Sequence, residues 1–279
     1  MTEPMRSFPT PPRSQDLIDD DGEPLETARH RQQMEVLIQS LELAWADRKD
    51  FYAGGNMFLY FSETQARKND FRGPDFFVVL GTDRHERRAW VVWEEDGKAP
   101  DVIVELLSES TEHVDRGEKM RVYARSLKVG EYFLFDPWSG VLEGYELDAA
   151  RGAYRRKSAD ARGRVYCEQV GLWLGTARSV LYGVEVDWLR WQDTEGKPLL
   201  FPTEAAMIAQ AQLEEGEQRE AAEAQRAREA VQRADTEAQR ANEAALRADT
   251  EAQRADTEAQ RAARLEAELE RLKAKLDER

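Results

Sequence analysis

The stretch from Pro100 to Ser108 constrains the fold most, because it has the pattern of an interior β-strand yet carries an acid in its middle. Val, Ile and Leu fill the run between a proline and a polar exit, which is typical of a strand covered on both faces. Strand side chains alternate between faces, so Glu105 shares a face with Asp101 and Leu107. A buried carboxylate is costly unless it is paired, hydrogen-bonded or bound to a metal. The sequence therefore predicts a partner for Glu105.

Two nearby segments supply candidate partners. Residues 73–80 have the pattern of a second strand, again opened by Pro-Asp, which places Asp75 at its start. Downstream, Asp115 is the predicted N-cap of a helix, with a glutamate three residues later as its capping-box partner, and Lys119 falls in the first turn. Neighbouring strands lie about 5 Å apart. If the two strands are adjacent, the carboxylates of Asp75 and Glu105 converge on one site that Lys119 can reach.

Length and composition limit the class of protein. The 279 residues suffice for one sizeable domain plus an extension. No apolar run approaches the ~20 residues of a membrane helix, and no secretory signal is evident, so we expect a cytoplasmic protein without a membrane partner. Cys167 is the single cysteine, and the three histidines share no metal-ligand spacing. Any metal is therefore expected to be held by oxygen, which favours Mg²⁺, Mn²⁺ or Ca²⁺ over zinc.

The charge balance bears on nucleic-acid binding. A formal net charge of −15 argues against broad, sequence-independent binding to a polyanion. A local groove can still be basic, because five cations cluster in the predicted helix that follows the Glu105 strand. These cations are Arg116, Lys119, Arg121, Arg125 and Lys128.

The chain divides by composition into three parts. Residues 1–26 are rich in proline and lack apolar periodicity, so we expect them to be disordered. Residues 27–202 mix strand-like runs with two helical patterns, which predicts an α/β domain with a mixed sheet. Residues 203–279 almost lack glycine and proline and predict a long helix. The expected elements of the domain are a helix over 27–47, strands over 51–61, 73–80, 89–93 and 101–107, a helix over 115–128, and strands over 131–135, 141–147, 153–157 and 165–170.

A seven-residue repeat organises the predicted tail helix. The run at 234–240 recurs at 248–254 and 255–261 and aligns alanines at alternating spacings of four and three. The same alternation then continues, after a stammer, with leucines, which form a better coiled-coil seam. We therefore expect a homo-oligomer assembled through the C-terminal helix; the alternative is a solvated single helix held by Glu–Arg pairs. The leucines are Leu265, Leu269, Leu272 and Leu276.

Four motifs in order carry a family resemblance. They are Gly-Pro-Asp-Phe-Phe-Val-Val at 73–79, Ala-Pro-Asp-Val-Ile-Val-Glu-Leu-Leu-Ser at 99–108, Asp115 with Lys119 and Tyr123-Ala, and Val-Gly-Glu-Tyr-Phe-Leu-Phe-Asp-Pro at 129–137. Together they resemble the Uma-type family of restriction endonucleases in the PD-(D/E)XK nuclease superfamily, over about residues 28 to 200. The resemblance implies a restriction-endonuclease-like mixed central sheet flanked by helices, here followed by a long C-terminal coiled-coil helix.

The resemblance also implies an Mg²⁺-dependent (or Mn²⁺-dependent) endonuclease acting on DNA. Asp75 and Glu105 match the two acids and are carried over as metal ligands, with Asp101 as a weaker candidate. The family's lysine position, two residues after the second acid, holds Leu107 instead. Lys119 on the following helix is the expected substitute, close to the attacking water. In such a site the metal polarises the phosphoryl oxygen and lowers the pKa of bound water, and a lysine orients or helps to deprotonate that water.

Each candidate has a structural alternative. Asp75 and Asp101 each follow a proline and could cap turns, and Lys119 could be a surface lysine. Glu35 on the first helix could add an acid to the site or lie on a solvated face. Two functions therefore stay open: a metal-dependent DNA endonuclease, or a catalytically silent scaffold that recruits partners through its coiled-coil tail. The retention of buried charges favours the endonuclease.

Overall fold

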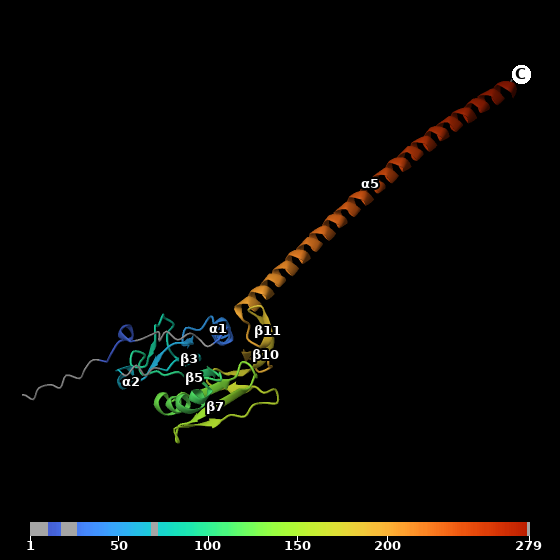
Figure 1. Cartoon of the computed structure of the whole chain (residues 1–279). Coiled ribbons are helices and arrows are strands. Elements are labelled where there is room, and N and C mark those ends of the chain that lie inside the picture. Colours follow the sequence, from blue (N-terminus) through green and yellow to red (C-terminus); the bar gives the residue numbers. More distant parts are fainter. Residues whose placement is uncertain (1–10, 18–26, 68–71, 278–279) are drawn as a thin grey trace, which may run out of the picture. The chain divides into compact units, whose positions relative to one another are not determined.

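The computed structural model describes residues 11–17, 27–67 and 72–277 (Figure 1). The chain forms two compact units, Met1–Ala206 and Met207–Arg279. Most of the segment expected to be disordered, residues 1–26, lies outside the described residues. Its described part includes the short helix η1 (Ser14–Asp16), next to Pro12, whose carbonyl accepts a 2.9 Å hydrogen bond from Trp93 Nε1.

The first unit is built on a mixed sheet, as the sequence predicts. Within the described residues, six strands pair in the order β1-β3-β5-β6-β7-β8. The pair β5–β6 is parallel and the other neighbours are antiparallel. The predicted adjacency of the Asp75 and Glu105 strands is confirmed, because β3 pairs with β5. The strands are β1 (Phe51–Gly54), β3 (Phe76–Leu80), β5 (Val102–Leu106), β6 (Glu131–Phe135), β7 (Leu142–Asp148) and β8 (Ala153–Arg156).

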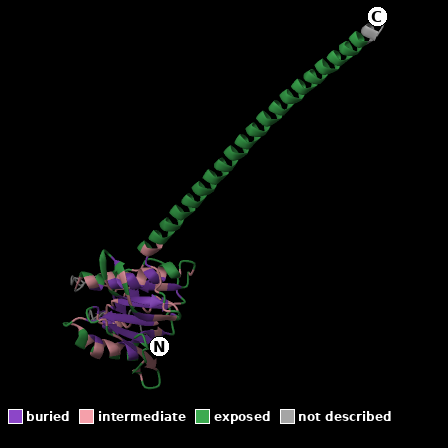
Figure 2. Ribbon diagram, turned by 90° about the vertical axis from the view of Figure 1, so that its right-hand side faces the viewer, coloured by how far each residue is buried: buried purple, intermediate pink, exposed green. Residues whose placement is uncertain are grey.

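Both faces of the central strand β5 are covered, and every one of its residues is buried (Figure 2). Val102, Val104 and Leu106 face a core formed with helix α1 (Ala28–Ala44) and a three-stranded sheet. Ile103 faces a second core, formed with the helical segment that follows β5. Alternation along the strand places Glu105 on this second face. The three-stranded sheet contains β9 (Val165–Cys167), β10 (Leu172–Leu181) and β11 (Val184–Gln192).

The helical segment after β5 differs from its predicted form in where it starts and how it winds. It begins at Glu112, directly after Thr111, so the prediction that Asp115 is its N-cap is wrong. Two stretches of the segment are π-helical, a form that often occurs at functional sites. Lys128 ends the segment in the left-handed conformation, with φ +54°. Its parts are α3 (Glu112–Val114), η2 (Asp115–Lys119), α4 (Met120–Val122) and η3 (Tyr123–Leu127).

The predicted strand over 51–61 is divided between two sheets. After β1 the chain bends at Gly54 and Gly55, and β2 (Leu59–Tyr60) then pairs in parallel with β4 (Trp90–Val91). A short helix, α2 (Glu63–Arg67), follows. The bend matters because it brings the backbone of Gly55 against that of Asp75.

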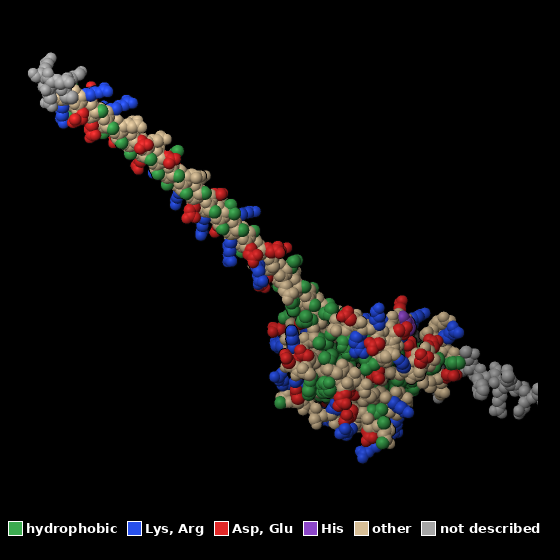
Figure 3. All heavy atoms as spheres, turned by 180° about the vertical axis from the view of Figure 1, so that it is seen from behind, with side chains coloured by type: hydrophobic (Ala, Val, Ile, Leu, Met, Phe, Trp, Pro, Cys, Tyr) green, Lys and Arg blue, Asp and Glu red, His purple; other side chains and the backbone are tan. Residues whose placement is uncertain are grey.

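The tail is one helix, α5 (Pro202–Asp277), as predicted. Its start is tied to the first unit, because Arg190 on β11 contacts Glu204 through Nη2 and Oε2 at 2.6 Å. Every side chain from Ala206 to Lys273 is exposed, and cations and acids alternate along the helix (Figure 3). Coiled-coil pairing of this helix stays a prediction. Among the described helices, none combines the length and apolarity that a bilayer crossing requires.

Candidate functional site

Asp75 and Glu105 are held together by two hydrogen bonds between adjacent strands. The backbone N–H of Asp75 donates to Glu105 Oε2 at 3.2 Å. In return, the N–H of Leu106 donates to Asp75 Oδ2 at 2.7 Å. Asp75 is partly exposed, whereas Glu105 is fully buried. The register of β3 and β5 thus produces the acid pair that the sequence predicts.

A glycine fixes the position of Asp75 from the other side. Asn56 N donates to Pro74 O at 3.0 Å, which draws the bend after β1 onto the start of β3. A Cβ on Gly55 would lie 2.1 Å from Asp75 O and 2.7 Å from the Met34 side chain. Because no real Cβ contact is that short, residue 55 has to be glycine for the acid to keep this place.

The helical segment supplies the cation. Lys119 Nζ lies 3.1 Å from Glu105 Oε2 and 2.8 Å from Asp115 Oδ1, and 18% of its side chain is exposed. Tyr123 Oη donates to Glu105 Oε1 at 2.8 Å, and Tyr132 Oη donates to the Asp115 carbonyl at 3.0 Å. The predicted reach of Lys119 to the acid pair is therefore observed.

Sequence reasoning missed two members of this cluster, Asp115 and Tyr123. Their spacing was visible, because Asp115, Lys119 and Tyr123 follow one another at intervals of four and so share a helix face. The capping pattern favours a cap role for Asp115, and the apolar periodicity places Tyr123 in a core stripe. In the structure, both are buried beside Glu105 and Lys119.

The cluster contains three acids and one lysine. Burial raises the pKa of Glu105 to about 8 against the lowering effect of Lys119, and the carboxylates of Asp75 and Asp115 raise it further. Burial also raises the pKa of Asp75, again against Lys119. For Lys119, burial acts to lower the pKa, but the surrounding carboxylates outweigh it and the pKa rises. The lysine is therefore held as a cation among three acids.

His30 extends the cluster from helix α1. Its ring is buried, with Nδ1 2.8 Å from Thr27 Oγ1 and Nε2 3.3 Å from the Leu107 carbonyl. Glu35, considered as a further acid, is not brought to the site. It accepts a 2.6 Å hydrogen bond from Gln39 Nε2 and lines a separate depression beside Pro202. The first helix thus contributes a histidine near the acids.

Asp101 also lies away from the acid pair. Its Oδ2 accepts a 2.7 Å hydrogen bond from Leu80 N, at the opposite end of β3 from Asp75. It lies four positions before Glu105, about 13 Å along a strand. Burial raises the pKa of Asp101, which is consistent with a partly covered turn carboxylate. The two residues share a face, as predicted, but the structure does not bring them together.

The donor set of the acid pair fits a hard divalent cation. Within the residues that the structure describes, no three His, Cys, Asp or Glu side chains are arranged to hold a metal ion by themselves. Mg²⁺, however, is usually bound by one or two carboxylates together with water and substrate oxygens. Asp75 and Glu105 are two such carboxylates, each with lone pairs beyond those that accept the hydrogen bonds described. Three acids beside one lysine also fit a bound cation, because its charge would favour the ionised carboxylates.

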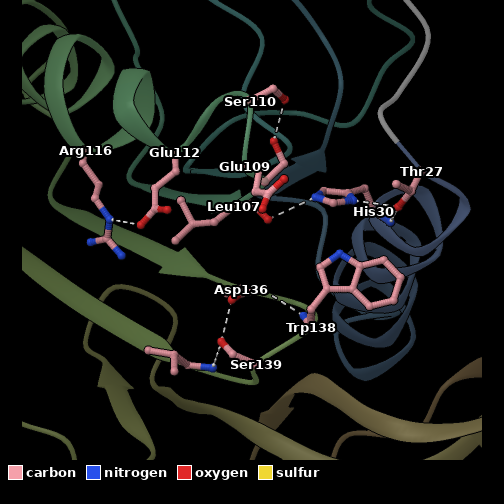
Figure 4. Close-up of a pocket in the computed structure, with 12 residues that line it drawn as sticks. Thr27, His30, Leu107, Glu109, Ser110, Glu112, Arg116, Asp136, Trp138 and Ser139 are labelled. Atoms are coloured by element: carbon pink, nitrogen blue, oxygen red, sulfur yellow. Dashed lines mark hydrogen bonds and ion pairs between the residues drawn. The ribbon is translucent and has the colours of Figure 1, made fainter.

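A cavity of about 1000 Å³ opens beside the cluster, where the parallel strands β5 and β6 end (Figure 4). Arg116 and Glu112 lie at one end, and His30, Thr27 and Trp138 at the other. The lining residues are Thr27, His30, Leu107, Ser108, Glu109, Ser110, Glu112, Arg116, Asp136, Trp138, Ser139 and Val141.

Comparison with known proteins places the chain in a nuclease class. A family model, Uma2, described as "Putative restriction endonuclease", matches residues 7–177. This match spans more than half of the chain, and the chain belongs to that family. The family resemblance seen in the sequence is thereby confirmed.

One solved structure that matches is described as a "putative nuclease belonging to DUF820 from Anabaena variabilis ATCC 29413". The identity is 14%, the match covers 55% of this chain and 81% of that chain, and the TM-score is 0.39. A search of curated proteins finds no match.

Proposed function

We propose that the chain is a metal-dependent endonuclease that hydrolyses DNA phosphodiester bonds. One observation carries the proposal: Asp75, Glu105 and Lys119, from two adjacent strands and a helix, meet in direct contact. Metal-dependent phosphodiester hydrolysis needs carboxylates that hold the divalent ion, and a lysine beside them can assist the attacking water. Membership of a family described as restriction endonucleases supports the same reaction.

The carboxylates of Asp75 and Glu105 would hold the metal, with Mg²⁺ or Mn²⁺ as the expected ion. Bound there, the metal would polarise the phosphoryl oxygen and lower the pKa of a water molecule. The chain's own contribution is positional. Tyr123 donates to one oxygen of Glu105 and the Asp75 N–H to the other, so the carboxylate is fixed before substrate arrives.

Lys119 would act as a cation and hydrogen-bond donor in this reaction. Its pKa is raised by Glu105, Asp115 and Asp75, so it keeps its proton at neutral pH. A charged ammonium beside the acid pair can orient the attacking water and offset the charge that develops on the phosphate.

The proposal is tested by metal binding and cleavage in one preparation. Supercoiled and single-stranded DNA are incubated with wild-type protein and Mg²⁺ or Mn²⁺, with and without a chelator, and ion binding is followed by calorimetry. We expect chelator-sensitive cleavage and a loss of at least about 100-fold in Glu105→Gln and Lys119→Met. Glu185→Gln is the matched control, because Glu185 is an exposed acid on β11.

Two results would contradict the endonuclease. One is a folded wild-type protein that neither binds the ions nor cuts either DNA. The other is cleavage that persists unchanged in Glu105→Gln, which would indicate a contaminating nuclease. The first result favours the scaffold alternative, in which the exposed helix α5 performs the function by assembly.

A further inference from the structure

The cavity beside the acid cluster shares a wall with it. Leu107 lines the cavity and lies two residues beyond Glu105, about 7 Å along the strand. The ladder continues to this point, because Leu107 N donates to Phe135 O at 2.7 Å. His30 joins the two regions, because it lines the cavity and its Nε2 lies 3.3 Å from the Leu107 carbonyl. A ligand in the cavity would therefore lie about two strand residues, or roughly 7 Å, from Glu105.

An exposed tryptophan stands at the cavity. Trp138 is 73% exposed, in contrast to the fully buried Trp90, Trp188 and Trp191. Its position is fixed by the turn after β6, since Trp138 N donates to Asp136 Oδ1 at 2.8 Å and the Ser139 hydroxyl donates to Oδ2 of the same carboxylate. An indole that is held at this turn with most of its surface exposed provides a flat apolar face that the described residues leave largely uncovered.

The polar groups of the cavity suit the edges of a base better than a run of phosphates. Arg116 is its lining arginine, but this guanidinium contacts Glu112 and Glu143. Glu109 adds a carboxylate to the lining, and carboxylates accept from the amino groups of bases. The walls therefore carry both signs of charge, without the basic track that a duplex backbone requires.

We propose that this cavity binds an unpaired nucleobase of single-stranded DNA, stacked on the Trp138 indole. The inference rests on the proposed nuclease function and names its substrate class. Stacking on aromatic side chains is a general mode of single-strand binding, because every base has a π-face. A base inside a duplex already stacks on its neighbours and is not available to Trp138.

Binding is measured in the presence of a chelator, so that cleavage does not enter. The probes are a short fluorescein-labelled single strand and the duplex of the same sequence, followed by anisotropy at low salt. We expect wild-type protein to prefer the single strand, and Trp138→Ala to bind it roughly tenfold more weakly. Trp138→Phe keeps an aromatic face and should retain most of the affinity. Val180→Ala, another exposed apolar residue, on β10, is the matched control.

The outcomes separate this inference from the proposed reaction. Equal single-strand affinities for wild type and Trp138→Ala, a preference for the duplex, or no binding to either probe would overturn the base site, whatever the cleavage assay gives. Trp138-dependent binding without cleavage would retain the base site and reject the nuclease. If Trp138→Ala unfolds at the same temperature as the wild type, misfolding is excluded as the cause of a loss of single-strand affinity.

Discussion

Lys119 and Asp115 face each other within one π-helical turn, with Nζ 2.8 Å from Oδ1, and the same ammonium lies 3.1 Å from Glu105. Asp115 therefore positions the cation. With the neutral Asp115→Asn, we expect cleavage to fall about tenfold, while the ion affinity measured by calorimetry changes little, because Asp115 is not among the proposed ligands. Glu118→Gln, an exposed acid on the same segment that does not line the cavity, is the control. An equal loss of ion affinity would show that Asp115 is itself a ligand.

Gly55 offers a test of how tightly Asp75 has to be placed. In Gly55→Ala the new methyl group collides with the Asp75 carbonyl, so the start of β3 shifts. We expect a loss of about 1–3 kcal/mol in stability. A displacement near 1 Å can reduce activity roughly 100-fold. Gly117→Ala is the matched control, because open space surrounds that position and alanine favours a helix. Wild-type cleavage by Gly55→Ala would mean that the position of Asp75 is not critical.

The acid pair was predictable because its signals are local and periodic. Two segments indicated core strands: the apolar run around Glu105 and the second segment that opens with Pro-Asp. The alternation of side chains along a strand then gave the face on which Glu105 lies. The alternation of side chains does not give the position of a residue along the strand. It therefore grouped Asp101 with Glu105 on one face, although Asp101 lies at the other end of the strand. A face can thus be read from a sequence more readily than a distance.

Other parts of the site escaped prediction because one pattern fits two structures. An aspartate three residues before a glutamate marks a helix start, yet here the helix begins earlier and Asp115 is inside it. The cavity with Trp138 is built from a loop, a turn and a helix end that only the tertiary fold brings together. The hairpin β10–β11 was missed as well, because polar and apolar residues alternate imperfectly around Gly175.

The pair Arg190–Glu204 predicts a pH dependence of stability. Burial acts to raise the pKa of Glu204, but hydrogen bonds from Arg190 and the Phe201 N–H outweigh it and lower the pKa. A lowered folded-state pKa stabilises the fold above the unfolded value, near 4.3, and this contribution is lost as pH falls through the folded value. We expect Glu204→Gln to lose about 1–2 kcal/mol at neutral pH in urea unfolding, with the difference shrinking in acid.

The exposed pair Arg178–Glu185 on the same hairpin provides the control for that measurement. Its members are solvated, so Glu185→Gln should change the free energy of unfolding by less than about 0.5 kcal/mol at either pH. A pH-independent deficit in Glu204→Gln would indicate a packing defect and contradict the ionic explanation.

The leucines near the end of α5 predict self-association. Leu265, Leu269 and Leu272 are each more than half exposed, and burying one such side chain contributes about 1.5–3 kcal/mol. Because they alternate at four and three, a second copy of the helix can cover all of them at once. We expect light scattering to give a multiple of the chain mass for the wild type and a single chain for Leu265→Ala combined with Leu269→Ala. Leu246→Ala, exposed but off the seam, should leave the mass unchanged.

A wild type that is monomeric at micromolar concentration would contradict this prediction. In that case α5 is a solvated single helix, stabilised by pairs such as Glu243–Arg247.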